Sequence, residues 1–134
     1  LNCSAGLAGN GPHAVSPLIT QTYSVFASDA NSCESDTLDL TVTVLPDIQF
    51  SMPDTLPVCP EVNLVLNAAP VTGGDGAYLY NWEGTGAAPQ SNHVVNLTAS
   101  ELICVTVNDG CETPVQTRCT FVEVIPIPAL VLTG

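Results

Sequence analysis

The stretches YSVFASDANSC at residues 23–33 and ICVTVNDGCETP at residues 103–114 decide the fold, because they belong to one ungapped repeat that aligns residue 23 with residue 103. Working outward from them, residues 3–46 superpose on residues 83–126. The identical pairs include Gly6 and Gly86, His13 and His93, Val15 and Val95, Val25 and Val105, Asp29 and Asp109, Thr37 and Thr117, Val42 and Val122, Val44 and Val124, and Pro46 and Pro126. A fixed period of this kind is typical of tandem module arrays.

The repeat predicts three parts along the chain. Residues 1–46 are the C-terminal half of one module, and residues 47–128 are a complete module. Residues 129–134 are predicted to be the first strand of a following module, or a donor strand that completes the sheet of another subunit. Proline closes each copy, at Pro46 and at Pro126 with Pro128, and such spacing favours a semi-rigid, extended joint.

Within the complete module the residue pattern is that of β-strands. Strands are expected around Leu64–Ala68, Tyr78–Trp82, Val94–Leu97, Ile103–Val107 and Phe121–Ile125, where apolar side chains alternate with polar or smaller ones. Turns rich in Gly, Pro, Asn and Asp separate them, as in the Gly73-Gly74-Asp75-Gly76 segment. No stretch has helical periodicity. Short strands at this spacing predict an all-β chain of tandem β-sandwich modules.

Composition limits the partners and the compartment. The chain has a net charge of −12, with 13 acidic residues and a single basic one, Arg118. Nucleic acid and anionic lipid are therefore disfavoured partners, and the absence of a long apolar run argues against membrane insertion. Six cysteines without a CxxC pair, in a small module, favour disulfides over metal ligation. We therefore expect a secreted or cell-surface protein.

The segment LVLNAAPVTGGDGAYLYNW at residues 64–82, followed by ICVTVNDGCETP, resembles a PKD-like or immunoglobulin-like repeat. Such repeats occur in large secreted surface proteins of Bacteroidetes-type bacteria, including gliding-associated adhesins exported by the type IX route. In the first copy, YSVFASDANSC is close to the recurring "YxVxVxDxxGC" pattern, although Ser32 stands where glycine is usual. The resemblance implies tandem immunoglobulin-like sandwich modules and a spacer or adhesive role.

The cysteines are assigned by strand geometry. Pairing outward from the turn at residues 108–113 places Cys104 opposite Cys119, on the face away from the core, at a separation that suits a disulfide. A second bond is expected between Cys59, before the first strand, and Cys111 in that turn. Cys3 and Cys33 are left to bond each other. Alternatively, Cys33 pairs with a cysteine in the front half of its own module.

The sequence offers little that predicts catalysis. Each copy holds one histidine, His13 or His93, and no G-x-S-x-G elbow is present, so we expect no catalytic residues and no enzyme activity. Calcium is the one cofactor considered, since Asp29 and Asn31 in one turn, and Asp109 and Glu112 in its equivalent, offer oxygen ligands. Asx residues that cap their own turns explain these positions equally well.

Two further features are a group of aromatic residues and a set of candidate glycosylation sites. Tyr78, Tyr80 and Trp82 alternate on one strand, and we expect them to form a packed aromatic core rather than a sugar-stacking platform. Four positions are candidate glycosylation sites: Asn2 and Asn96 lie in N-x-[ST] sequons. Thr37 and Thr55 lie in two DTL segments that look like the O-glycan acceptor of Bacteroidetes surface proteins.

These observations predict an extracellular structural repeat module of a cell-surface adhesin or filament, acting as a disulfide-stiffened spacer or display stalk. Its expected partners are neighbouring modules or subunits of the same protein, with surface glycans as a further candidate. The alternative is a carbohydrate-binding or spacer module of a secreted polysaccharide-degrading enzyme.

Overall fold

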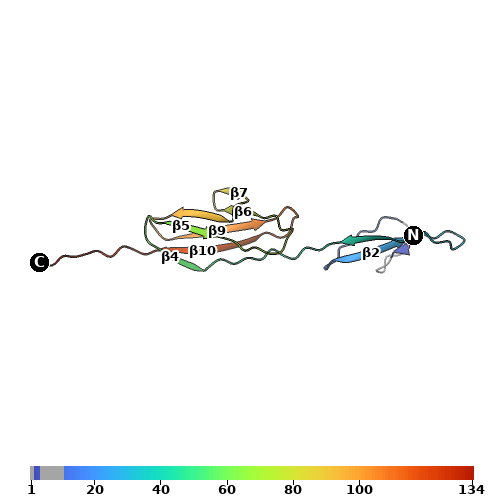
Figure 1. Ribbon diagram of the computed structural model, residues 1–134, viewed down its shortest axis with the longest axis horizontal. Helices are drawn as coiled ribbons and strands as arrows, with labels where there is room; N and C mark the ends of the chain where they lie inside the picture. The colour runs from blue at the N-terminus through green and yellow to red at the C-terminus, as the bar shows by residue number, and fades with distance from the viewer. Residues whose placement is uncertain (1, 4–10) are drawn as a thin grey trace. The chain divides into compact units, whose positions relative to one another are not determined.

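The computed structural model of the chain describes residues 2–3 and 11–134 and divides the protein into two compact units, Leu1–Leu45 and Pro46–Gly134 (Figure 1). The described residues form ten strands and no helix, which confirms the predicted all-β class. It follows that this part of the chain contains no helix long and apolar enough to cross a membrane.

The second unit consists of a five-stranded and a two-stranded sheet. The order in the larger sheet is β4 (Thr55–Val58), β10 (Gln116–Val124), β9 (Glu101–Asn108), β6 (Leu79–Trp82) and β7 (Gly86–Ala88). The smaller sheet pairs β5 (Asn63–Asn67) with β8 (Asn92–Asn96). All of these pairs are antiparallel except β4 with β10, which run parallel.

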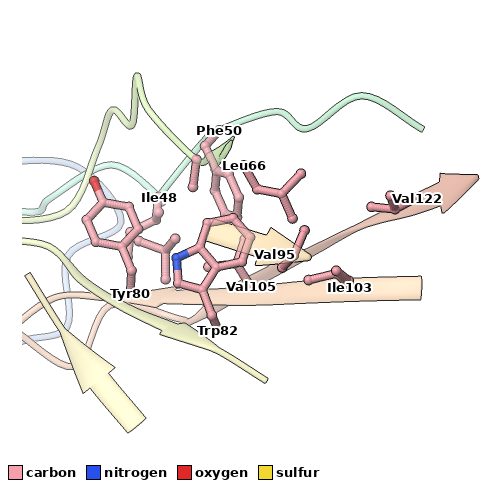
Figure 2. Packing of buried hydrophobic residues seen from close by; sticks show 11 residues of the cluster. Ile48, Phe50, Leu66, Tyr80, Trp82, Val95, Ile103, Val105 and Val122 are labelled. Atoms are coloured by element: carbon pink, nitrogen blue, oxygen red, sulfur yellow. The ribbon is translucent and has the colours of Figure 1, made fainter. Parts of the chain in front are cut away.

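The hydrophobic core of this unit draws side chains from both sheets and from the segment that precedes β4 (Figure 2). From residue 103 onward the alternation in β9 is complete, since Ile103, Val105 and Val107 are buried while the residues between them are half-buried. The buried apolar residues are Ile48, Phe50, Leu66, Ala68, Tyr80, Trp82, Val95, Ile103, Val105, Val107 and Val122. Two facing apolar surfaces therefore form a sandwich-like core, each large side chain contributing about 1.5–3 kcal/mol on burial.

The first unit is a three-stranded sheet in the order β1 (Asn2–Cys3), β2 (Gln21–Phe26) and β3 (Leu38–Val42). No second sheet covers it within the described residues. Consequently Leu40, the repeat equivalent of the buried Thr120, is 64% exposed, and Val42 is only half-buried where its equivalent Val122 is fully buried.

Each unit contains its own copy of the same hairpin, as the repeat predicts. Tyr23 and Leu40 are partners in β2–β3, and their repeat equivalents Ile103 and Thr120 are partners in β9–β10. The turns agree as well. Ser32, which stands where the resemblance expects glycine, has a φ of 62°, and its equivalent Glu112 has a φ of 57°.

Two strands of the second unit were not predicted from the sequence. They are β4, which contains Pro57, and β7, which is only three residues long. Proline is compatible with β4 because this strand lies at the edge of the sheet. Both strands lie at the margins of the larger sheet, where local patterns are weakest.

The segment at residues 129–134 pairs with no strand in the described part of the chain. It forms no ladder with the described residues, and Leu130 and Leu132 are each 90% exposed. Its role as the first strand of a following module, or as a donor strand for another subunit, stays a prediction.

Candidate functional site

A disulfide joins the two central strands of the second unit. Cys104 in β9 and Cys119 in β10 are directly opposed, are bonded, and have Cα atoms 4.0 Å apart. Their side chains lie on the face away from Val105 and Val122, which are fully buried. The predicted Cys104–Cys119 bond is therefore confirmed, and it crosslinks the sheet without occupying space in the core.

The first unit has a polar pair at the equivalent rung. Ser24 and Asp39 are cross-strand partners, and the Ser24 hydroxyl donates a hydrogen bond to the Asp39 carboxylate. Each unit therefore joins its hairpin at this rung, once covalently and once by a hydrogen bond. A further rung of the second unit is joined by the hydroxyls of Thr106 and Thr117, 2.8 Å apart.

The predicted Cys59–Cys111 bond is wrong, because both cysteines are exposed free thiols. The parallel pairing of β4 with β10 explains the error. Val58, next to Cys59, is the partner of Val124 at one end of β10, whereas the turn that holds Cys111 precedes Gln116 at the other end. Eight strand steps, or about 26 Å, separate the two ends, far more than the Cα separation of a disulfide.

The predicted Cys3–Cys33 bond is likewise absent, since Cys33 is an exposed free thiol. The side chain of Cys3 lies outside the described residues. In the backbone ladder Cys3 pairs with Val25, and Cys33 lies beyond the bridge between Ser28 and Glu34. These levels are three residues apart along the strand, about 10 Å, so direct bonding would require the backbone to move.

The Asp109 carboxylate joins two loops at one end of the second unit. Its Oδ1 accepts the backbone N–H groups of Cys111 (3.1 Å) and Thr113 (3.2 Å), and its Oδ2 accepts that of Asp75 (2.9 Å). A hydrogen bond from the Thr113 side chain, together with these backbone bonds, lowers the pKa of Asp109 despite its desolvation. The bond to Asp75 was not predicted, because no local pattern indicates contact between two loops so distant in the sequence.

The equivalent turn of the first unit has the same cap. Asp29 Oδ1 accepts the N–H groups of Asn31 (2.8 Å) and Cys33 (2.9 Å). Asx capping, one of the two explanations given for these turns, therefore describes both of them. Among residues 11–134 no group of three or more His, Cys, Asp or Glu side chains is placed to hold a metal ion. Calcium binding by Asp29, Asn31, Asp109 or Glu112 stays a prediction, and none of these residues belongs to a group of that kind in the described part of the chain.

The aromatic residues of β6, together with Tyr78 just before this strand, belong to the core. Trp82 is 3% exposed and Tyr80 is 7% exposed, while the half-buried Tyr78 donates its hydroxyl to the carbonyl of Gly73 (2.6 Å). These side chains leave no sugar-stacking platform on that strand. His93 stacks on Trp82 with ring centroids 5.4 Å apart, so it closes the margin of the core, whereas its equivalent His13 is exposed.

The candidate glycosylation sites differ in accessibility. Thr37 and Thr55 are both exposed. Asn96 is exposed as well, but its Nδ2 donates to the carbonyl of Glu61 (3.0 Å) and to Oδ1 of Asn63 (2.8 Å). Because Nδ2 is the atom that an N-linked glycan modifies, glycosylation at Asn96 would remove at least one of these bonds. The side chain of Asn2 lies outside the described residues.

Comparison with known proteins gives no family for the chain. A scan against models of protein families finds no match, and a search of curated proteins finds no relative. The repeat, the disulfide and the layout of the second unit are therefore the features that bear on function.

Proposed function

We propose that the chain is a structural repeat module of a secreted, cell-surface adhesin or filament, in which it acts as a spacer or display stalk. The observation that carries this proposal is the recurrence of one hairpin in both units, with the same register and the same capped turn. A PKD-like or immunoglobulin-like identity for the module remains part of the proposal and is supported by the sandwich-like core.

The layout of the second unit supports a spacer role. Its N-terminal segment lies at one end, where the amide of Gly74 donates to the carbonyl of Pro46 (2.8 Å). The chain leaves at the opposite end of β10, where the amide of Ile125 donates to the carbonyl of Val58 (2.9 Å) (Figure 1). Modules with opposite ends of this kind extend a chain when they are joined in series. The strong negative charge favours repulsion between neighbouring modules over collapse.

The test is to lengthen the chain by one module and measure its dimensions in solution. Residues 1–125 joined directly to residues 46–134 duplicate the complete module in its own linker register, since residues 45 and 125 are equivalent. Small-angle X-ray scattering should show a maximum dimension greater by about 30–40 Å, near the length of the nine-residue β10 with its end loops. An unchanged dimension would contradict the spacer proposal.

The polysaccharide-related alternative is tested by the same proteins. A spacer should bind no glycan on an array of plant and microbial polysaccharides, whereas a carbohydrate-binding module should bind a defined subset. Binding that survives duplication and grows with module number would favour the alternative.

A further inference from the structure

The sheet of the first unit has an apolar face, here called the open face. It consists of the cross-strand pairs Tyr23–Leu40 and Val25–Leu38 of β2 and β3, together with Val42 of β3. Leu38 is 68% exposed and Leu40 is 64% exposed, and no second sheet covers them in the described part of the chain. The open face therefore has the composition of a core but lacks a covering layer.

The equivalent face of the second unit is covered by a segment of the same unit. The equivalent residues of β9 and β10 are Ile103, Val105, Arg118, Thr120 and Val122. The segment before β4 contributes Ile48 and Phe50 to the core that the apolar members of this face form (Figure 2). The Arg118 guanidinium lies 5.8 Å from the centre of the Phe50 ring, and the Thr120 hydroxyl donates to the carbonyl of Pro53 (2.8 Å). This covering segment therefore lies directly against the face of the hairpin.

The tail at residues 127–134 is equivalent to the covering segment. When the ungapped register of the repeat is continued, the tail superposes on residues 47–54. The equivalent apolar pairs are Leu130 with Phe50, and Leu132 with Met52. In the second unit the phenylalanine and the methionine pack in the core, whereas the two leucines of the tail are each 90% exposed. The tail thus carries uncovered apolar side chains at the positions that cover the hairpin in the second unit.

The open face and the tail match each other in chemistry. Where Arg118 lies over Phe50 in the second unit, the first unit has Leu38 and the tail has Leu130, so two apolar side chains replace a cation and an aromatic ring. Neither the open face nor the tail contains a charged residue, in a chain with a net charge of −12. Because two such chains repel each other through their acidic surfaces, uncharged apolar surfaces are where two copies can come into contact.

We propose that the open face binds the tail of a second copy of this chain, in the register that residues 47–54 adopt on β9 and β10. This inference rests on the proposed repeat array and names the partner of its open face. In this register Leu130 packs against Leu38. The amide of Thr41 donates to the carbonyl of Gly134, as the equivalent amide in β10 donates to the last residue of the covering segment (2.9 Å). Each copy has one tail and one open face, so the copies assemble head to tail in a line.

The test measures self-association of the full chain by sedimentation velocity at increasing concentration. To exclude intermolecular disulfides, the parent protein carries Cys3→Ser, Cys33→Ser, Cys59→Ser and Cys111→Ser. In the tail variant, Leu130→Asp places a carboxylate at the covering position. The matched control is Val131→Asp, which adds the same charge at the position equivalent to the exposed Ser51. In the face variant, Leu38→Asp adds a carboxylate to the open face, and amide exchange verifies that β2 and β3 remain paired.

The parent protein should form oligomers that grow with concentration. Leu130→Asp should weaken association more than about tenfold, because docking would bury an unpaired carboxylate, and Val131→Asp should weaken it less than about threefold. The tail variant and the face variant should each stay monomeric alone at the concentrations at which the parent associates. Their equal mixture should form dimers that grow no further, because one intact tail and one intact open face remain.

A parent protein that stays monomeric up to about 1 mM, or equal weakening by Leu130→Asp and Val131→Asp, would overturn the proposal. A monomer in which Leu130→Asp lowers amide protection in β2 and β3 would show that the chain's own tail covers the open face, which also overturns it. The duplicated chain described above separates the two ideas. If it lengthens while the parent stays monomeric, the docking alone is refuted, whereas a duplicated chain that fails to lengthen refutes the array as well.

Discussion

Breaking the Cys104–Cys119 bond should destabilise the second unit by about 3 kcal/mol. The two cysteines have a sequence separation of 15. A crosslink that closes a loop of this length restricts the unfolded chain and so stabilises the folded unit by about 3 kcal/mol, which is lost when the bond is broken. Single domains are stable by only about 5–15 kcal/mol. The bond therefore accounts for a large part of the stability of so small a module.

The measurement is urea unfolding of the oxidised chain and of the Cys104→Ser/Cys119→Asp variant, with tryptophan fluorescence as the readout of unfolding. Trp82 is the only tryptophan in the sequence and is buried in the second unit, so its emission reports on that unit alone. With a denaturant slope of about 1–3 kcal/mol per molar urea, the midpoint should fall by about 1–3 M. The substitution copies the Ser24–Asp39 rung of the first unit.

The serine–aspartate rung should recover no more than about 1 kcal/mol, the net contribution of a typical hydrogen bond. Adding reductant should move the midpoint of the oxidised chain by a similar amount and leave that of the variant unchanged. Equal midpoints for the oxidised chain and the variant, at equal slopes, would refute the argument that the crosslink stabilises the unit through its unfolded state.

Three further predictions concern the N-terminal end of the second unit. Folding lowers the pKa of Asp109, so its carboxylate contributes stability at pH values above its unfolded pKa of about 3.9. In urea titrations, the difference in unfolding free energy between the native protein and the Asp109→Asn variant should therefore shrink as the pH falls below about 5. Gly76→Ala should cost about 1–2 kcal/mol through left-handed backbone strain alone, because its Cβ would meet nothing within 4 Å. Gly73→Ala should cost more, because its Cβ would also lie 2.0 Å from a backbone oxygen; equal melting curves for the two variants would contradict this. Desolvation and two neighbouring carboxylates raise the pKa of Cys111, so it should react with iodoacetamide more slowly at neutral pH than in urea, and Asp75→Asn should accelerate the native reaction.

The local features of this fold could be predicted from the sequence, because they depend on short-range patterns. The alternation in β9 identified its buried face, and outward counting from the turn at Asp109 gave the correct partner for Cys104. The burial of Trp82 followed from its position two residues after Tyr80, on the same face of the strand. Each of these inferences needs only the period of a strand and the length of one turn.

The position of Cys59 could not be predicted in the same way, because it depends on a non-local pairing. β4 lies beside β10, which is far from it in the sequence, and runs parallel to it. Pro57 also argues against a strand at this position, because proline within an apolar run is compatible only with an edge strand, a first strand residue or a bulge. Nothing in the local sequence states that β4 lies against β10 or in which direction it runs, and its direction decides which end of the module Cys59 occupies.

The comparison of the two units separates what sets the hairpin register from what stabilises it. The ladder has the same register in β2–β3 and β9–β10, yet only the second hairpin has the disulfide. Both hairpins share the aspartate cap, with Asp29 and Asp109 each accepting two amides of the turn. Since turn geometry fixes strand register, the capped turn is sufficient for the alignment, and the disulfide adds stability to a register that already exists. Amide exchange in the Cys104→Ser/Cys119→Asp variant should therefore show the same protected residues with lower protection, whereas a changed set of protected amides would refute this assignment.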